Sequence, residues 1–354
     1  MALLFVDPFD AHANQDSITP TQFKTMCPNS TLTSNAFFTS DMTELVNGPD
    51  GATSRALAVT YSSGYWANVA IDLGKTVTTK LVVGLLLGAR VSGTWGFLRV
   101  GSGALNTSST SADDILYFDA TNGRLYINGT YSANGIVSLS GYYYITVEYN
   151  FSSGTVDVYL DGGTTPIISA TTSLTSADRF NLGVTTAPSS SSFQNIFDDI
   201  YALDDSGTEN TSRLGVIKVR RAPLVAEVET NFTPMGGATT NISAVNKTNR
   251  STTTYNQSPD TNDLPDTFTI DTSAVPSGAT VHAVAMYAFH RKVNANPRTL
   301  ALIARDDTDE FEQEVTQRTG DFGADMVIME TMPDGSPLTP AAIADLEVGY
   351  EAKA

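Results

Sequence analysis

Tyr142-Tyr-Tyr-Ile-Thr-Val-Glu-Tyr149 and Thr155-Val-Asp-Val-Tyr-Leu160 are separated by the turn sequence Asn150-Phe-Ser-Ser-Gly154. Both flanking stretches are rich in aromatic and β-branched residues, which favour extended strands. In the second stretch, two valines and a leucine alternate with Asp and Tyr, the period of a strand with one face toward solvent. The three segments therefore predict a β-hairpin.

Further strands follow on both sides of this hairpin. Lys80–Leu87 is a continuous apolar run, as in a buried strand. Ile115–Phe118 and Arg124–Ile127 flank Asn122-Gly123, a strong hairpin signal. Phe197–Leu203 closes the series, and no stretch before it has helical periodicity. Strands at about ten-residue spacing with turns between them indicate a β-sandwich.

The second half of the chain also favours strands. Val281–Phe289 and Leu300–Ala304 bracket Asn294–Pro297, which predicts another hairpin. One short helix is expected near the end, because Thr339 suits the N-cap and Pro340 suits the first helical position. The fold class is therefore all-β, with a C-terminal β-sandwich that includes one short helix.

Length and charge limit the organisation and the partners. A chain of 354 residues suits two domains, expected at 1–216 and 217–354. The net charge is -18, with 19 acidic and 9 basic residues before position 217 and 19 and 11 after it. Neither half offers the basic surface that neutralises phosphates, so nucleic-acid binding is not expected.

The N-terminus and the cysteine content exclude several site types. Met1–Val6 is apolar but stops at Asp7, and it lacks the basic region and the length of a signal peptide or membrane span. It is expected to form the first strand. Cys27 is the single cysteine, so neither an intrachain disulfide nor a thiolate zinc site is expected. Cys27 is either a reactive nucleophile or, as we prefer, a small structural residue.

Two acidic clusters are candidates for cation binding. Asp198-Asp199 and Asp204-Asp205 place four carboxylates in eight residues, but not at the spacing of a calcium loop. Capping of backbone N–H groups is the preferred interpretation, and a bound cation is the alternative. The second cluster is expected on one exposed face that serves solvent, a partner surface or a cation; its members are Asp306, Asp307, Asp309, Glu310, Glu312 and Glu314.

No catalytic, cofactor or metal-binding residue is predicted. The spacings Glu-x-Asp-x-Glu and Glu-x-Asp-x-x-Glu, known from sandwich-fold glycoside hydrolases, do not occur, nor do common hydrolase or phosphate-loop motifs. His12, His282 and His290 are expected to be structural. The other candidates are aromatic residues, expected to pack in the core rather than to stack on a sugar: Tyr142, Tyr143, Tyr144, Tyr149, Trp66 and Trp95.

The order of several motifs resembles one family. Phe5–Asp10 resembles the first strand of the laminin-G-like domains found in bacteriophage virion proteins. Tyr144–Tyr149 with Val156–Gly162 is similar to their central strand pair, and Asp198–Gly207 to the end of that domain. Leu338–Glu351 is similar to the end of the β-domain that follows it in such proteins. The resemblance implies a concanavalin-like jelly roll at 1–216 and a virion assembly or attachment domain at 217–354.

This resemblance implies a structural protein on the exterior of a virion, as a capsid decoration or a compact tail or fibre component. The expected partners are other virion proteins and further copies of the chain, with a trimer as the natural oligomer. The alternative is a receptor- or glycan-binding tail protein that uses loops of the jelly roll, with a host-surface glycan as ligand. No enzymatic activity, no cofactor and no membrane insertion are expected.

Overall fold

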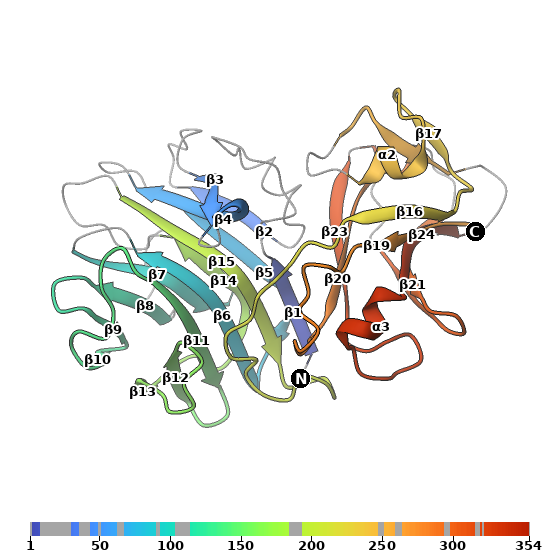
Figure 1. Cartoon of the computed structure of the whole chain (residues 1–354). Helices are drawn as coiled ribbons and strands as arrows, with labels where there is room; N and C mark the ends of the chain where they lie inside the picture. Colours follow the sequence, from blue (N-terminus) through green and yellow to red (C-terminus); the bar gives the residue numbers. More distant parts are fainter. Residues whose placement is uncertain are drawn as a thin grey trace. The chain divides into compact units, whose positions relative to one another are not determined.

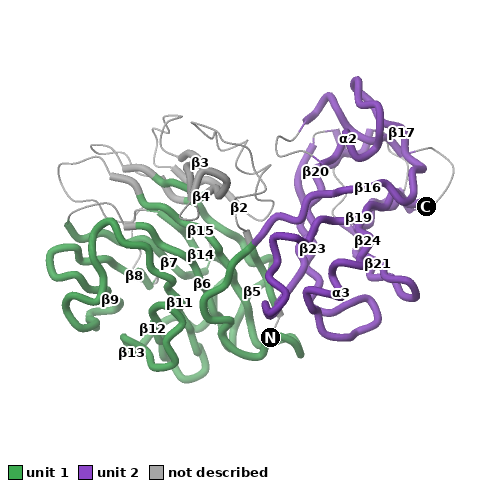
Figure 2. The backbone as a smooth tube through the Cα atoms, viewed as in Figure 1, with its two compact units in different colours: residues 1–219 green, residues 220–354 purple. Residues whose placement is uncertain are grey.

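The computed structural model describes the chain in segments that form two compact units, residues 1–219 and 220–354 (Figure 2). The described residues are 2–7, 30–34, 43–48, 51–61, 67–89, 93–102, 114–183, 193–246, 251–258, 264–293, 298–315, 319–320 and 322–353. The division falls three positions beyond the boundary expected at residue 216. His12, Cys27, Trp66 and Asn294–Pro297 lie outside the described residues.

The first unit contains an eight-stranded antiparallel sheet, in the order β13-β12-β11-β6-β15-β4-β3 with β1 beside β15 (Figure 1). The hairpin predicted from Tyr142–Leu160 is confirmed as β11 and β12, with Val147 opposite Val158. The strands are β1 (Ala2–Asp7), β3 (Thr43–Gly48), β4 (Gly51–Tyr61), β6 (Lys80–Ala89), β11 (Tyr142–Asn150), β12 (Thr155–Leu160), β13 (Ile168–Thr171) and β15 (Phe193–Asp204).

The second layer of this unit is a seven-stranded antiparallel sheet in the order β10-β9-β8-β7-β14-β5-β2. The hairpin expected around Asn122-Gly123 is confirmed as β8 and β9. The strands are β2 (Ser30–Ser34), β5 (Ala67–Val77), β7 (Thr94–Gly101), β8 (Asp114–Asp119), β9 (Arg124–Ile127), β10 (Thr130–Tyr131) and β14 (Ala177–Gly183). Together the two sheets form a jelly-roll β-sandwich, as predicted.

Apolar side chains between the two sheets form the core of the first unit. Phe5 of the eight-stranded sheet meets Phe180 of the seven-stranded sheet edge-on, with ring centroids 6.1 Å apart. Trp95 is fully buried and stacks on Phe118 at 5.1 Å. Aromatic residues bury the largest apolar areas, so these contacts contribute strongly to the stability of the sandwich.

A bulge divides β15 into two parts. Its first half pairs with β4 and its second half pairs with β1, while β6 runs along the other edge. The register shifts between Asp198 and Tyr201, where Asp199 adopts a φ of 46°. A bulge of this kind bends a strand and increases its twist. β15 thus pairs along one edge with β4 and then with β1.

The second unit is built on a five-stranded sheet in the order β16-β19-β24-β21-β22, with two separate strand pairs, β17-β18 and β20-β23. Buried apolar side chains from β20, β21 and β23 share one core with Ile343 and Leu346. The strands are β16 (Leu224–Glu229), β17 (Thr233–Met235), β18 (Tyr255–Gln257), β19 (Pro265–Ile270), β20 (Val284–His290), β21 (Thr299–Arg305), β22 (Glu310–Glu314), β23 (Gly323–Met329) and β24 (Glu347–Lys353).

Two expectations for this unit need correction. The predicted hairpin between Val281–Phe289 and Leu300–Ala304 does not form, because β20 pairs with β23 while β21 pairs with β22 and β24. The expected helix is α3 (Pro340–Ala344) with Thr339 as its N-cap, but a second short helix, α2 (Asn241–Val245), was not predicted.

In the described part of the chain, no helix has the length and apolar character needed to cross a membrane.

Buried Asp266 organises one end of the second unit. Its side chain accepts hydrogen bonds from the backbone N–H groups of Asn231 and Phe232, at 2.6 and 2.9 Å. It also accepts from Asn241 Nδ2 at 2.7 Å and from the Tyr350 hydroxyl at 2.9 Å. These donors come from the β16–β17 connection, α2 and β24. One fully buried carboxyl group therefore joins three elements to β19.

Candidate functional site

Two successive hairpins place three tyrosines in one row on the seven-stranded sheet. β8 and β9 pair with Tyr117 opposite Tyr126, and β9 and β10 pair with Tyr126 opposite Tyr131. The second hairpin turns through Asn128 and Gly129, whose φ angles are 49° and 77°. Positive φ at both central residues is the backbone of a two-residue turn that matches strand twist, and Asn-Gly favours it. This turn fixes the register that aligns the tyrosines.

The three rings form a stacked ladder, which we call the tyrosine ladder (Tyr117, Tyr126 and Tyr131). The rings of Tyr117 and Tyr126 are parallel within 5°, with centroids 4.5 Å apart. The rings of Tyr126 and Tyr131 are 4.8 Å apart and tilted by 30°. Neighbouring Phe118, Leu125 and their cross-strand partners face the core, so the ladder occupies the outer face. Tyr131 is 48% exposed.

A charged pair lies beside the ladder. Arg124 Nε donates to Asp119 Oδ2 at 3.0 Å, and the Arg124 guanidinium carbon lies 4.0 Å from the centre of the Tyr131 ring. Asn122 Nδ2 also donates to Asp119 Oδ2, at 2.8 Å. Burial opposes ionisation of Asp119, but the hydrogen bonds from Asn122 and Arg124 outweigh it and hold the pKa of this carboxyl below its usual value.

The ladder hydroxyl of Tyr126 stays protonated over the physiological range. Burial, followed by the neighbouring hydroxyls of Tyr117 and Tyr131, raises the pKa of Tyr126 to about 12. A protonated phenol both donates and accepts hydrogen bonds. The ladder therefore presents apolar ring surface together with neutral polar groups, next to a guanidinium, a carboxylate and an amide.

Part of the outer face of the eight-stranded sheet is covered by the chain itself. Residues 205–219, which we call the covering segment, follow β15 and lie against this face. The Arg213 guanidinium carbon lies 3.4 Å from the centre of the Tyr159 ring, and Leu214 N–H donates to the Tyr201 hydroxyl at 3.2 Å. Val219 N–H donates to Asp199 Oδ1 at 2.8 Å. These contacts occupy the surface of β12 and β15 that a ligand would otherwise meet.

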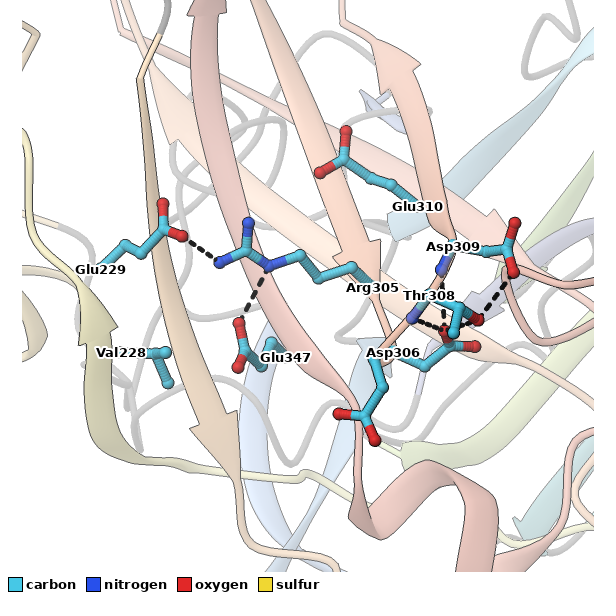
Figure 3. Close-up of a pocket in the computed structure, with 9 residues that line it drawn as sticks. Val228, Glu229, Arg305, Asp306, Thr308, Asp309, Glu310 and Glu347 are labelled. Atoms are coloured by element: carbon cyan, nitrogen blue, oxygen red, sulfur yellow. Dashed lines mark hydrogen bonds and ion pairs between the residues drawn. The ribbon is translucent and has the colours of Figure 1, made fainter.

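A second polar site is an open depression of about 470 Å³ in the second unit (Figure 3). Arg305 lies between two carboxylates, with Nη2 2.6 Å from Glu229 Oε1 and Nε 2.9 Å from Glu347 Oε2. The turn after it is held by Asp306, whose Oδ1 accepts from the N–H groups of Thr308 and Asp309 at 2.9 Å. These backbone hydrogen bonds hold the pKa of Asp306 below its usual value. The acidic residues here form an ion-pair network and a turn.

The glutamates of β22 form a separate cluster. Carboxylate oxygens of Glu310, Glu312 and Glu351 lie within 4.8 Å of one another. Lys353 Nζ forms an ion pair with Glu312 and lies 3.8 Å from Glu351 Oε2. The hydrogen bond with Glu312 raises the pKa of Lys353. Lys353 thus supplies positive charge inside this cluster, and Glu314 lies exposed at the end of the strand.

The four aspartates near the end of the first unit have structural partners. Asp198 Oδ1 accepts from Asp199 N–H at 2.8 Å, inside the β15 bulge. Asp204 pairs with Lys75 and accepts from the Ser206 hydroxyl at 2.7 Å. The hydroxyl of Thr79 donates to Asp205. The arrangement agrees with capping, and the one close group of acidic ligands found among the described residues does not include them.

The remaining candidates lie in structural positions where they are described. His290 Nε2 is 2.8 Å from Asp325 Oδ2 in the β20–β23 pair, and burial lowers the pKa of His282. Tyr144 and Tyr149 are buried. Tyr143 hydroxyl accepts from Ser138 N–H at 2.6 Å, and Tyr142 is 37% exposed. These tyrosines do not assemble into one exposed platform.

The tyrosine ladder was not predicted, although the sequence contains its signals. Tyr117 and Tyr126 lie at equal distances from the middle of the loop that contains Asn122-Gly123. Asn128-Gly129 is a second Asn-Gly pair and therefore a two-residue hairpin signal. Two hairpins built on these turns pair Tyr117 with Tyr126 and Tyr126 with Tyr131, which places the three tyrosines in one row.

Comparisons with known proteins assign no family. No protein-family model and no curated protein matches the sequence. A solved sialidase is 12% identical over 57% of this chain and 18% of its own length, with a TM-score of 0.39. Lectin UEA-II in complex with galactose is 14% identical over 54% of this chain and 96% of the lectin, with a TM-score of 0.33. At these values the likenesses transfer no activity.

Proposed function

We propose that the first unit is a non-catalytic glycan-binding jelly roll and that the tyrosine ladder is its recognition surface. The observation behind the proposal is the row of Tyr117, Tyr126 and Tyr131 beside Arg124 and Asp119. Tyrosine provides rigid amphipathic contact area at low entropic cost, because only two side-chain torsions must be fixed.

The chemistry of the ladder suits a sugar. Pyranose rings present C–H groups that pack on aromatic surface and hydroxyls that exchange hydrogen bonds with phenols, amides and charged groups. Specific sites combine mainly apolar contact area with a few polar groups that fix orientation. Tyr131, the most exposed ring of the ladder, supplies apolar contact area, and the tyrosine hydroxyls supply polar groups within the same hairpin region.

The absence of catalysis is part of this proposal. Glycoside hydrolysis by paired carboxylates needs one acid with a raised pKa facing a second carboxylate across a cleft. In the second unit, Glu229 and Glu347 are both engaged by Arg305, and Asp306 is engaged by its own turn. These contacts are those of an ion-pair network and a turn.

The test is a glycan-binding measurement on three proteins: the full chain, Tyr131→Ala and Tyr142→Ala. Tyr131 lies in the ladder, whereas Tyr142 is a similarly exposed tyrosine on β11 and serves as the matched control. Loss of one aromatic contact is expected to weaken binding about tenfold in Tyr131→Ala. Tyr142→Ala is expected to bind as the unaltered chain does. Equal binding by all three proteins, or a glycan array without any hit, would contradict the proposal.

A second proposal is that the chain is a structural protein on the exterior of a phage virion, assembled from several copies. The resemblance of its ordered motifs to laminin-G-like virion proteins supports this placement. In addition, β16 is an edge strand of the five-stranded sheet and exposes Val225 by 59% and Val228 by 46%. Exposed apolar edge strands are typical of surfaces that pair with other chains.

Light scattering of the purified chain and a reconstruction of intact particles test this second proposal. A stable oligomer, expected as a trimer, and density for the jelly roll on the particle surface would support it. A chain that stays monomeric at high concentration and is absent from particles would refute it. The glycan-binding proposal is independent of this outcome.

A further inference from the structure

The charges beside the tyrosine ladder are balanced within the hairpin itself. Asp119 Oδ2 accepts from Arg124 Nε at 3.0 Å and from Asn122 Nδ2 at 2.8 Å. Asp119 Oδ1 accepts from the N–H groups of Thr121 and Asn122, at 3.1 and 3.3 Å. Both oxygens are therefore used by the turn and by the guanidinium. An anionic ligand would have to compete with Asp119 for Arg124.

The guanidinium of Arg124 is also held in place by the ladder. Its central carbon lies 4.0 Å from the centre of the Tyr131 ring, and its side chain is only 25% exposed. A cation over an aromatic face is stabilised by the ring electrons. Withdrawing Arg124 toward a ligand carboxylate would break this contact and the ion pair with Asp119 together.

The negative electrostatic field of the whole chain also disfavours the binding of an anionic ligand. The first 216 residues contain 19 acidic and 9 basic residues, a net charge of 9 − 19 = −10, and the chain as a whole carries -18. A surface of this sign lowers the local concentration of polyanions and slows their association. Uronate polymers and sialylated chains meet this repulsion before they reach the ladder.

The groups that remain for recognition are uncharged. Tyr126 has its pKa raised to about 12, so its phenol is neutral when it donates or accepts a hydrogen bond. Aromatic surface and neutral phenols match sugar C–H faces and hydroxyls without any acidic substituent. We infer that the ligand of the tyrosine ladder is a neutral glycan and not an acidic one. This inference rests on the proposed glycan-binding function and narrows its ligand class.

The experiment compares retention of the full chain in gels that contain a neutral β-glucan or galactan with gels that contain alginate or hyaluronan. Retention is expected in a neutral gel and none in the acidic gels, with little change between low and physiological salt, because no net ion pair is formed. Tyr131→Ala is expected to weaken this retention about tenfold.

A gain of function gives a second arm. Asp119→Asn keeps an oxygen for the turn N–H groups but removes the charge that balances Arg124. Without the carboxylate, the Arg124 guanidinium can pair with an acidic ligand, so retention in the acidic gels is expected to rise about two- to fivefold at low salt. Asp157→Asn is the matched control, because it removes one charge from β12, where Asp157 bonds the Ser169 hydroxyl and no guanidinium. It is expected to produce no such rise.

The outcomes separate the two proposals. Retention of the unaltered chain by alginate or hyaluronan that is lost in Tyr131→Ala would overturn the neutral-ligand inference while leaving glycan binding intact. An equal rise in Asp119→Asn and Asp157→Asn would refute the role of the Asp119–Arg124 pair. Absence of retention in every gel would overturn both the inference and the proposed function.

Discussion

Replacing Asp266 by alanine is expected to destabilise the second unit strongly. The side chain is fully buried and accepts four hydrogen bonds of 2.6–2.9 Å, from Asn231, Phe232, Asn241 and Tyr350. Each bond to a charged acceptor contributes about 1.5–3 kcal/mol, but members of one network are not additive. Removing the carboxyl group leaves these buried donors without their acceptor, which costs about 1–3 kcal/mol for one group and about 3–5 kcal/mol for the network, since its members are not additive. We expect the free energy of unfolding to fall by about this amount.

The assay must report on the second unit, because both tryptophans, Trp66 and Trp95, lie in the first. Urea unfolding followed by circular dichroism gives the total change, and amide exchange of the peptides around Phe232 and Asn241 locates it. Asp266→Asn keeps the shape and one acceptor oxygen, and is expected to lose less stability than Asp266→Ala. Asp334→Ala is the control, because that exposed side chain accepts only from Ser336 N–H in its own turn.

The reasoning would be refuted by an Asp266→Ala chain that unfolds at the same urea concentration as the unaltered chain. It would also be refuted by faster amide exchange confined to the first unit. Unchanged exchange at Asn231 and Phe232 would show that their N–H groups do not depend on the carboxyl group. A large loss in Asp334→Ala would indicate a general sensitivity of the second unit instead.

Two further predictions concern the first unit. A Cβ atom at Gly84 would lie 2.0 Å from the Tyr201 ring, so Gly84→Ala is expected to cost about 1–3 kcal/mol by urea unfolding, whereas Gly278→Ala, with no atom within 4 Å, is expected to cost little. Burial opposes ionisation of Asp204, but hydrogen bonds from Lys75 and Ser206 hold its pKa below 3.8. Its contribution to stability is therefore present above that value and lost as pH falls through the folded-state pKa. Between pH ~5 and ~2, Asp204→Asn should lose less stability than the unaltered chain, and equal slopes would contradict this.

Local sequence patterns predicted the strands of the first unit well. The alternation in Thr155–Leu160 and the apolar run of Lys80–Leu87 both report burial of one or two strand faces, and both form strands of the eight-stranded sheet. Asn122-Gly123 fixes a hairpin because its backbone preference is local. Thr339 and Pro340 predicted α3 for the same reason, since capping involves only neighbouring residues.

Pairing between distant strands was less predictable. Val281–Phe289 and Leu300–Ala304 were expected to pair because they are adjacent in sequence, yet β20 pairs with β23 and β21 lies between β22 and β24. Helix α2 also escaped prediction, because it lacks the proline at the first helical position that marked α3. Its Asn241 side chain is held by Asp266 and by the Phe232 carbonyl, contacts that no local pattern contains.

The candidate site shows the same division. Two Asn-Gly turns set the register of Tyr117, Tyr126 and Tyr131, so the row itself is a local property of the sequence. Whether those rings face the core or the solvent depends on tertiary packing, because the opposite face of the same strands packs against the eight-stranded sheet. Tyr142, Tyr143 and Tyr144 do not form an exposed sugar-stacking platform, and the reason is tertiary. Tyr144 is buried, and its hydroxyl donates a hydrogen bond to the Asp199 carbonyl in the β15 bulge.

The sequence by itself determined an all-β chain, its main hairpins and its acidic net charge, because each depends on composition or on neighbouring residues. Only the tertiary structure decided which acidic residues accept hydrogen bonds within the fold and which aromatic residues stay exposed. Asp199 accepts a hydrogen bond from the N–H group of Val219, twenty positions later, and Asp266 accepts one from the Tyr350 hydroxyl on another strand. Such contacts depend on sheet order, which brings together residues that no sequence window contains.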